Sequence, residues 1–531
     1  MSRILICDSL EEIGLDLLRQ SGAEVHMLTK EERPRLAELI TGFDAVVVRS
    51  ATKVTAELLR AGKSLKVVGR AGVGVDNVDV ATATELGILV VNAPTANLLS
   101  ATEHTVALLL SLARMVPAAD RSMKQGEWDR KSFQGVELHG KTLGVVGFGR
   151  IGQGVAARAR SFEMEVLAFD PFLDPAVADR LGVELTGLDD LLSRSDFITL
   201  HTPFTPDTKN LLSAERIAMI KPGAMLINCA RGGIVDEPAL LAALEAGRLG
   251  GAAIDVFAEE PPTDFRLAQH PKVVATPHIG AQTAEAQERI ARETARMVIS
   301  ALEGSLPAGA VNLPFRPAGK AGEVFLPLAE QLGRLASLAG EGGLQRLQID
   351  LWGVDEAQRP AITVAVLKGA LAPFMGEGVN YVNAERAAGE RGVAVSCAVH
   401  SGPADYPNLV CVRLTSAGGE VELSGTLFSE LDPRVVSIGG FRLEFRPEGK
   451  LLLLANLDVP GVVGKLGLAL GNAGVNIAGI HLARPQGTDG DGGSRQAMAV
   501  LHLDQTPSAE VLQAIEAFPE IARVKFVDMG P

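Results

Sequence analysis

The sequence is poor in cysteine and in the larger aromatic residues. Its 531 residues include four Cys, two Trp and two Tyr. The cysteines are widely spaced and form no CxxC pair, so we expect neither a disulfide framework nor a metal site. No apolar run reaches about 18 residues, which argues against a membrane-spanning helix. Acidic residues at positions 8, 11 and 12 do not fit a signal peptide, so we expect a cytoplasmic protein.

Basic residues are also scarce, with 50 Lys and Arg against 64 Asp and Glu and a formal net charge of −14. Proteins that bind nucleic acid or an anionic membrane usually present a basic face, so we expect neither partner. One segment is an exception, because residues 49–70 contain six basic residues and one acidic residue. A few placed cations can focus the field on a small anion, and this segment therefore predicts a basic pocket.

Hydrophobic residues are abundant, at 47% of the total. At about 100–200 residues per domain, the length suggests about three to five domains. The first 300 residues alternate short β-branched segments with helical patterns, which predicts an α/β fold with two doubly wound, Rossmann-like parallel sheets. The expected strands are 4–7, 45–48, 66–68, 89–91, 142–146, 166–169, 197–200, 224–228, 252–256 and 273–276. Residues 100–103 have the spacing of a capping box and predict the start of a helix between the two sheets.

The remainder of the chain predicts two further domains. Residues 308–322 are rich in Pro and Gly and indicate a linker, and the α/β alternation then becomes irregular. The last eighty residues have the order strand, helix, strand, strand, helix, strand of a ferredoxin-like unit, with 486–494 at a hairpin tip. The expected parts are 1–97 with 280–308, 98–279, 309–447 and 448–531.

The sharpest motif is Gly147-Phe148-Gly149-Arg150-Ile151-Gly152, which follows a predicted strand and opens a predicted helix. Its glycines allow a tight turn and close approach of a pyrophosphate, which the helix N-terminus would bind. Asp170 ends the next strand eighteen residues beyond Gly152, where a carboxylate accepts hydrogen bonds from the adenosine ribose. Its charge disfavours a 2′-phosphate, so we expect NAD as cofactor. The alternative is a glycine-rich turn without a ligand.

Four segments resemble the D-isomer-specific 2-hydroxyacid dehydrogenases, and especially the phosphoglycerate dehydrogenases within that family. They are residues 67–78, 228–236, 254–261 and 276–280 (VVGRAGVGVDNV, NCARGGIVD, IDVFAEEP and TPHIG). The middle of the chain resembles the intervening domain of the long bacterial form, and its end resembles an ACT regulatory domain. The resemblance implies that 1–97 with 280–308 bind substrate, that 98–279 bind NAD, and that 309–447 and 448–531 are the intervening and ACT domains.

The resemblance also implies a catalytic set of Arg231, Glu260 and His278. All three lie beyond predicted strands, where ligands of open α/β sheets gather. A histidine can take the hydroxyl proton while hydride leaves the carbon, and a neighbouring carboxylate raises its basicity. An arginine can grip a substrate carboxylate with two parallel hydrogen bonds. Taken singly, each residue has an alternative: a turn-capping histidine, a solvated loop glutamate or a surface arginine.

By the same resemblance, further residues lie near the cofactor. Asp255 would accept a hydrogen bond from the nicotinamide carboxamide. We expect Cys229 to pack and not to react, because hydride transfer needs no thiolate. The expected cofactor contacts beyond the glycine-rich turn are Thr202, Pro203, Thr208, Cys229, Ala230, Asp255 and Gly280.

Substrate choice is predicted from cations at strand ends. Arg49 and Arg70 follow neighbouring predicted strands, and two guanidinium groups there can hold a phosphate. The alternative is a solvated rim. The resemblance implies oxidation of D-3-phosphoglycerate, a phosphorylated 2-hydroxy acid, to 3-phosphohydroxypyruvate in L-serine biosynthesis, by a homodimer or homotetramer in which Arg130 crosses the interface. The expected substrate-binding residues are Arg49, Ser50, Lys53, Arg70, Gly72, Asn97 and Arg130.

The ACT resemblance implies a regulatory site for L-serine. Asn456, Asp458 and Asn476 would hold the ammonium and carboxylate groups of serine between paired domains. The alternative is that Asp458 caps the following helix and Pro460 starts it. Val459 and Asn456 depart from the residues that many relatives carry at these positions.

Three other functions remain open from the sequence. A glyoxylate or hydroxypyruvate reductase shares the three catalytic residues, although Arg49, Arg70 and the C-terminal domain weigh against it. An NAD-sensing corepressor uses the same scaffold to bind proteins, but we expect such a protein to carry a disordered tail. An amino-acid sensor that has lost activity would not need Arg231, Glu260 and His278.

Overall fold

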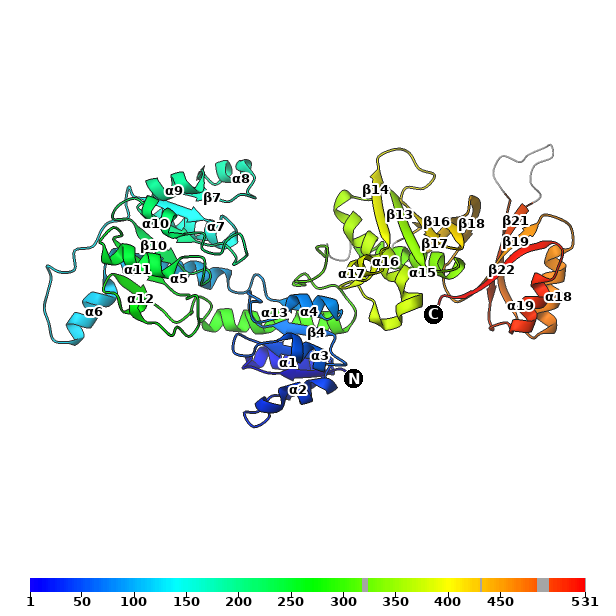
Figure 1. Cartoon of the computed structure of the whole chain (residues 1–531), viewed down its shortest axis with the longest axis horizontal. Helices are drawn as coiled ribbons and strands as arrows, with labels where there is room; N and C mark the ends of the chain where they lie inside the picture. Colours follow the sequence, from blue (N-terminus) through cyan, green and yellow to red (C-terminus); the bar gives the residue numbers. More distant parts are fainter. Residues whose placement is uncertain (318–322, 430–431, 485–495, 531) are drawn as a thin grey trace. The chain divides into compact units, whose positions relative to one another are not determined.

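The computed structural model describes residues 1–317, 323–429, 432–484 and 496–530, and the predicted hairpin tip at 486–494 lies outside them. The chain, drawn in Figure 1 with colours that follow the sequence, divides by its internal contacts into two compact units. One consists of residues 1–9, 16–92 and 294–531, and the other of residues 10–15 and 93–293. Among the described residues, no helix is both long and apolar enough to cross a membrane.

The first unit begins with a parallel five-stranded sheet in the order β2-β1-β3-β4-β5. Valine and isoleucine dominate β1, β3 and β4, which are buried as expected for a parallel sheet covered on its faces. Helices α3 (Ala56–Ala61) and α4 (Val80–Glu85) contribute Leu58, Leu59 and Ala83 to its core. The strands are β1 (Arg3–Ile6), β2 (Glu24–Met27), β3 (Ala45–Val48), β4 (Val67–Arg70) and β5 (Leu89–Asn92).

The second unit contains a parallel seven-stranded sheet in the order β12-β11-β10-β9-β6-β7-β8. One core holds residues of α5 (Leu98–Ala113) and α7 (Arg150–Ser161). A separate core holds residues of α9 (Leu188–Arg194), α10 (Ala214–Met219) and α11 (Glu237–Glu245). The strands are β6 (Thr142–Val146), β7 (Glu165–Phe169), β8 (Glu184–Leu185), β9 (Phe197–Leu200), β10 (Met225–Asn228), β11 (Gly251–Ile254) and β12 (Val273–Ala275).

All ten strands predicted for this half of the chain are present. The sequence missed β2, which alternates polar and apolar residues over only four positions, and β8, which has two residues. The capping box predicted at residues 100–103 is wrong. Helix α5 begins at Leu98 after an N-cap at Asn97, so Ser100 lies inside the helix and is not its cap. The Ser100 hydroxyl donates instead to the carbonyl of Gly280.

The irregular middle of the chain forms a mixed six-stranded sheet in the order β14-β13-β15-β16-β17-β18, in which only the β13–β14 pair is parallel. Helices α15 (Leu326–Ala339) and α16 (Arg359–Met375) share its core, and α17 (Ala384–Glu390) follows. The strands are β13 (Leu344–Trp352), β14 (Ala394–His400), β15 (Leu409–Ser416), β16 (Gly419–Leu427), β17 (Pro433–Ile438) and β18 (Phe441–Phe445).

The C-terminal part has the predicted βαββαβ order and an antiparallel sheet in the order β20-β21-β19-β22. Its first and third strands therefore lie in the centre, as in a ferredoxin-like unit. The elements are β19 (Lys450–Leu457), α18 (Val462–Asn472), β20 (Ile477–Ala483), β21 (Gln496–Leu503), α19 (Ala509–Glu516) and β22 (Ile521–Asp528). The predicted fold class is thus confirmed, with two parallel sheets, a mixed sheet and a ferredoxin-like end.

Candidate active site and cofactor site

The glycine-rich turn joins the end of β6 to the start of α7. Gly147 has φ of +90°, and a Cβ on it would lie 2.7 Å from the carbonyl carbon of His201. A Cβ on Gly152 would lie 2.3 Å from the carbonyl oxygen of Gly147. Gly149 is the N-cap of α7, and a Cβ there would meet open space in the described chain. The start of α7 thus has open space beside Gly149, and a helix N-terminus of this kind is a ready site for a phosphate.

Two polar groups beside this turn have the chemistry of a dinucleotide site. Asp170 follows β7, and its carboxylate accepts hydrogen bonds from the backbone N–H groups of Phe148 (2.9 Å) and Phe172 (3.0 Å). Thr202 follows β9, and its buried hydroxyl has no hydrogen-bond partner within the described residues. Nearby, the Thr208 hydroxyl donates to the Pro203 carbonyl at 2.6 Å, which fixes that loop. A carboxylate by the turn and an orphaned hydroxyl fit a polar ligand such as NAD.

Arg231, Glu260 and His278 follow β10, β11 and β12, which are neighbours in the parallel sheet. His278 Nδ1 lies 2.6 Å from Glu260 Oε2, and Glu260 Oε1 accepts the backbone N–H of Phe257 at 3.1 Å. Burial alone would raise the pKa of Glu260, but the hydrogen bond and charge of His278 hold it below its ordinary value. The carboxylate therefore stays ionised and can orient the imidazole.

The loop that carries Arg231 is fixed by its own backbone. Asn228 Nδ2 donates to the carbonyl of Arg231 at 3.0 Å, and Arg231 Nη1 donates to the carbonyl of Ala230 at 2.7 Å. A Cβ on Gly232 would lie 1.8 Å from the carbonyl oxygen of Phe257, so only glycine permits this contact. The contact joins the loop after β10 to the loop after β11, which carries Glu260.

Cys229 is half-buried and Asp255 is buried, each just beyond the end of its strand. Burial raises the pKa of the Cys229 thiol to about 12, so it keeps its proton, as expected for a packing residue. The Asp255 side chain is 1% exposed and accepts hydrogen bonds from the backbone of Ile279 (2.9 Å) and Gly280 (3.0 Å). The predicted contact of Asp255 with the carboxamide stays a prediction.

The predicted anion-binding arginines of the first unit lie at the ends of β3 and β4. Arg49 and Ser50 line a cavity of about 330 Å³ with Asp8, Ser9 and Arg33. Arg49 Nη1 donates to the Ser9 hydroxyl at 3.3 Å, while Asp8 accepts the Arg49 backbone N–H at 2.7 Å.

Arg70 lies against Gly72, where a Cβ would stand 1.5 Å from Arg70 Nη1. Gly72 has φ of +145°, so glycine is favoured there by both its conformation and this contact. Lys53 is exposed, just beyond the Arg49–Ser50 turn. Asn97 and Arg130 belong to the other compact unit. Asn97 is the N-cap of α5 and its Oδ1 is buried, while Arg130 is exposed in the segment after α6 (Val116–Lys124).

In the ferredoxin-like unit, the three predicted regulatory residues have different surroundings. Asn456 on β19 is 7% exposed, and its Nδ2 donates to the Leu457 carbonyl at 2.8 Å. Asn476 Nδ2 donates to Asp504 at 2.6 Å. Asp458 pairs with Arg484 at 2.6 Å. Helix α18 starts at Val462 after an N-cap at Gly461, so the alternative that Asp458 caps it is wrong.

Comparison with known proteins decides the family. Residues 106–280 match the NAD binding domain of the D-isomer specific 2-hydroxyacid dehydrogenases, and residues 323–439 match the D-3-phosphoglycerate dehydrogenase intervening domain. The chain is 41% identical to D-3-phosphoglycerate dehydrogenase of Bacillus subtilis over 532 residues, covering 100% of both chains. It is 40% identical to the enzyme of that name from Methanocaldococcus jannaschii over 535 residues, again covering 100% of both.

The chain belongs to the D-3-phosphoglycerate dehydrogenase family. It is an NAD-dependent 2-hydroxyacid dehydrogenase. A solved NAD-dependent formate dehydrogenase from Staphylococcus aureus, in complex with NAD, is 32% identical and covers 58% of this chain and 97% of its own, with a TM-score of 0.53.

Sequence reasoning about this family member missed three residues. Arg33 lines the cavity of Arg49, and its Nη1 donates to Thr52 at 3.0 Å. Arg484 pairs with Asp458, and His104 on α5 lies 3.2 Å from Asp255. Only His104 could have been found from the local sequence, because it lies one helical turn after Ser100 and therefore on the same face of the helix. The other two meet their partners through folding alone.

Proposed function

We propose that the chain oxidises the C2 hydroxyl of D-3-phosphoglycerate to give 3-phosphohydroxypyruvate, the first step of L-serine biosynthesis. The observation that carries this proposal is the 2.6 Å pair of His278 and Glu260. Glu260 follows β11, which lies between β12, before His278, and β10, before Arg231. Relatives that match the whole chain are named for this substrate. We assign substrate binding to 1–97 with 280–308, NAD binding to 98–279, and the intervening and ACT domains to 309–447 and 448–531.

In this proposal, His278 takes the hydroxyl proton at Nε2, because its Nδ1 faces Glu260. Glu260 stabilises the imidazolium that forms. Arg231 binds the substrate carboxylate with two N–H groups and polarises the reacting oxygen. NAD supplies the acceptor for the hydride that leaves C2. The products are the 2-oxo acid, NADH and one proton.

The cofactor would be held by the glycine-rich turn and the loops beyond the strands. The backbone of residues 147–152 would bind the pyrophosphate at the start of α7, and Asp170 would accept from the ribose. Thr202, Pro203, Thr208, Cys229, Ala230, Asp255 and Gly280 would surround the nicotinamide side. The open space at Gly149 and the orphaned Thr202 hydroxyl support this assignment.

The phosphate of the substrate would bind to Arg49 and Arg70, supported by Ser50, Lys53, Gly72 and Asn97. We expect wild-type kcat/KM to be far higher for D-3-phosphoglycerate than for D-glycerate. Arg49→Gln and Arg70→Gln should each lower the value for phosphoglycerate by about 10–150-fold, since a hydrogen bond to a charged group contributes about 1.5–3 kcal/mol. The values for glycerate should change little. Steady-state kinetics with both substrates measures this.

Arg60→Gln is the matched control, because Arg60 lies in the same basic segment but pairs with Glu85 on the surface. It should leave both substrates unaffected. Equal wild-type kcat/KM values for phosphoglycerate and glycerate would contradict the phosphate site and favour a reductase of unphosphorylated acids.

We also propose that L-serine binds at Asn456, Asp458 and Asn476 and lowers activity. Asn456 Oδ1 is a buried acceptor without a partner in the described chain, and Asp458 offers a carboxylate for an ammonium group. Millimolar serine should inhibit the wild type. Asn456→Ala and Asp458→Asn should raise the half-inhibitory concentration by about 10–150-fold, the loss of one hydrogen bond to a charged group.

The control for this experiment is Asn472→Ala at the exposed end of α18, which should keep wild-type inhibition. Wild-type enzyme that is indifferent to serine would remove the regulatory proposal and leave the catalytic one intact. The homodimeric or homotetrameric state, the passage of Arg130 across its interface and the cytoplasmic location stay predictions.

A further inference from the structure

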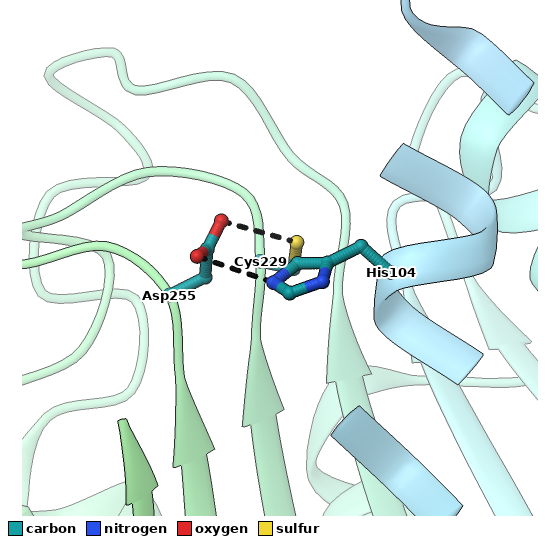
Figure 2. A group of neighbouring side chains, drawn as sticks. All are labelled: His104, Cys229 and Asp255. Carbon is teal, nitrogen blue, oxygen red and sulfur yellow. Dashed lines mark hydrogen bonds and ion pairs between the residues drawn. The ribbon is translucent and has the colours of Figure 1, made fainter. Parts of the chain in front are cut away.

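The carboxylate of Asp255 lies at the centre of a cluster formed with His104, Cys229 and Thr276. Its Oδ1 accepts from the Thr276 hydroxyl (2.6 Å) and the Ile279 backbone (2.9 Å), and lies 3.2 Å from His104 Nε2. Its Oδ2 accepts from the Gly280 backbone (3.0 Å) and the Cys229 thiol (3.6 Å). Figure 2 shows Asp255 facing both Cys229 and His104, the latter projecting from α5. This buried carboxylate therefore accepts hydrogen bonds from three residues of one loop, Thr276, Ile279 and Gly280.

The loop that Asp255 binds is the one that carries His278. His278 has φ of +53°, in the left-handed region that is uncommon for residues other than glycine. Its backbone N–H donates to the Asp255 carbonyl at 2.8 Å, and the next two N–H groups donate to the Asp255 carboxylate. A conformation of this kind persists where the surrounding contacts determine it. The hydrogen bonds to Asp255 therefore hold His278 in its left-handed conformation.

Helix α5 also contacts this loop. Ser100 and His104 stand one turn apart on a common face of the helix. The Ser100 hydroxyl donates to the Gly280 carbonyl at 2.7 Å, and His104 Nε2 lies 3.3 Å from the Thr276 hydroxyl. Both ends of the loop 276–280 therefore contact side chains of α5.

The cluster offers the nitrogen, sulfur and oxygen ligands of a metal site, but its groups are already satisfied. Both oxygens of Asp255 accept hydrogen bonds, and burial keeps the Cys229 thiol protonated. Burial would also raise the pKa of Asp255, but the hydrogen bonds from His104, Thr276 and Ile279 bring it below its ordinary value. Asp255 is thus an anion surrounded by protein donors, and among the donors in the described part of the chain only His104 comes from α5.

We propose that His104 is a positioning residue of the dehydrogenase reaction. Through its Nε2 contacts with Asp255 and Thr276, it holds the loop 276–280 in the conformation that presents His278 to Glu260 and to the substrate. This inference rests on the role assigned to His278 in the proposed function. His104 itself would not touch the reacting atoms.

Three substitutions at position 104 separate the hydrogen bond from the volume of the ring. His104→Gln places an amide N–H near the position of Nε2. The side chain of His104→Asn also carries an amide N–H but is too short to reach that position, and His104→Leu carries no donor. We expect kcat for phosphoglycerate oxidation to fall about 10–100-fold in the Asn and Leu variants, the scale expected for a small misplacement of a catalytic group. The Gln variant should keep kcat within about threefold of the wild type.

A double-mutant cycle with His278→Asn tests whether His104 acts through His278. If it does, adding His104→Asn to His278→Asn should lower kcat by less than about twofold further, because coupled residues are non-additive. The control is His139→Leu, since His139 is an exposed histidine of the same unit that pairs with Glu163 and should leave kcat unchanged. The melting temperature of each variant is measured alongside.

The outcomes distinguish the two proposals. Full additivity in the cycle, or Asn and Gln variants with equal kcat, would overturn the positioning role whatever happens to the melting temperature. If the Leu variant does not fold, the comparison of Asn with Gln still decides. A His278→Asn enzyme with wild-type kcat would instead overturn the proposed role of His278, and the positioning role with it.

Discussion

Replacing His278 with asparagine should lower kcat for phosphoglycerate oxidation by about 10²–10⁴-fold, the usual contribution of a positioned general base. Asparagine is chosen because it tolerates the left-handed backbone conformation of His278 better than most residues. The loop should therefore keep its shape while the base is lost. The affinity for NAD, measured by fluorescence titration, should stay within about threefold of the wild type, because the side chain acts on the substrate proton.

Glu260→Gln is the companion of this experiment. It keeps a hydrogen-bonding group opposite His278 Nδ1 but removes the negative charge that stabilises the imidazolium. Its kcat should lie between those of the wild type and His278→Asn. A His278→Asn enzyme that keeps more than about a tenth of wild-type kcat would show that another group is the base.

Replacing Arg231 with glutamine should lower kcat/KM by about 10²–10³-fold, the loss expected when a donor to the reacting oxygen is removed. The fall should be similar for phosphoglycerate and for glycerate, because both carry the carboxylate that Arg231 would bind. This equality separates Arg231 from Arg49 and Arg70, whose removal should affect only the phosphorylated substrate. Steady-state kinetics with the two substrates makes the comparison.

Two further variants sharpen the test of Arg231. Arg231→Lys should recover only part of the loss, because an ammonium group cannot form two parallel hydrogen bonds with a carboxylate. Arg266→Gln should have no effect, because Arg266 is an exposed arginine paired with Asp264. A lysine variant with wild-type kcat/KM would exclude the bidentate contact.

The sequence was sufficient to predict the parallel sheets and the places of the proposed catalytic residues beyond their strands. Strands such as 45–48 and 197–200 are short, apolar and bounded by polar residues, and they form where predicted. Because the strands are parallel and adjacent, residues beyond their ends gather at one edge, which explains why His278 and Glu260 meet.

Other features could not be predicted, because they depend on groups that only folding brings together. The strand at 24–27 pairs with β1 although Glu24 and His26 give it no apolar run. Ser100 has the spacing of a cap, yet its hydroxyl is used by Gly280, 180 residues away in the sequence. The left-handed backbone of His278 and the donors around Asp255 likewise come from distant segments and leave no local pattern.

The hydrogen bonds of Asp170 bear on attempts to redesign the cofactor preference. Its carboxylate is a candidate for ribose binding and also ties the Phe148 amide of the glycine-rich turn to the loop at Phe172. Exchanging this aspartate for a neutral or basic residue would remove the repulsion toward a phosphorylated ribose. It would also remove the acceptor of the Phe148 amide, in the turn that would bind the pyrophosphate. An engineered NADP-dependent form would therefore need a second substitution that supplies a new acceptor for the Phe148 amide.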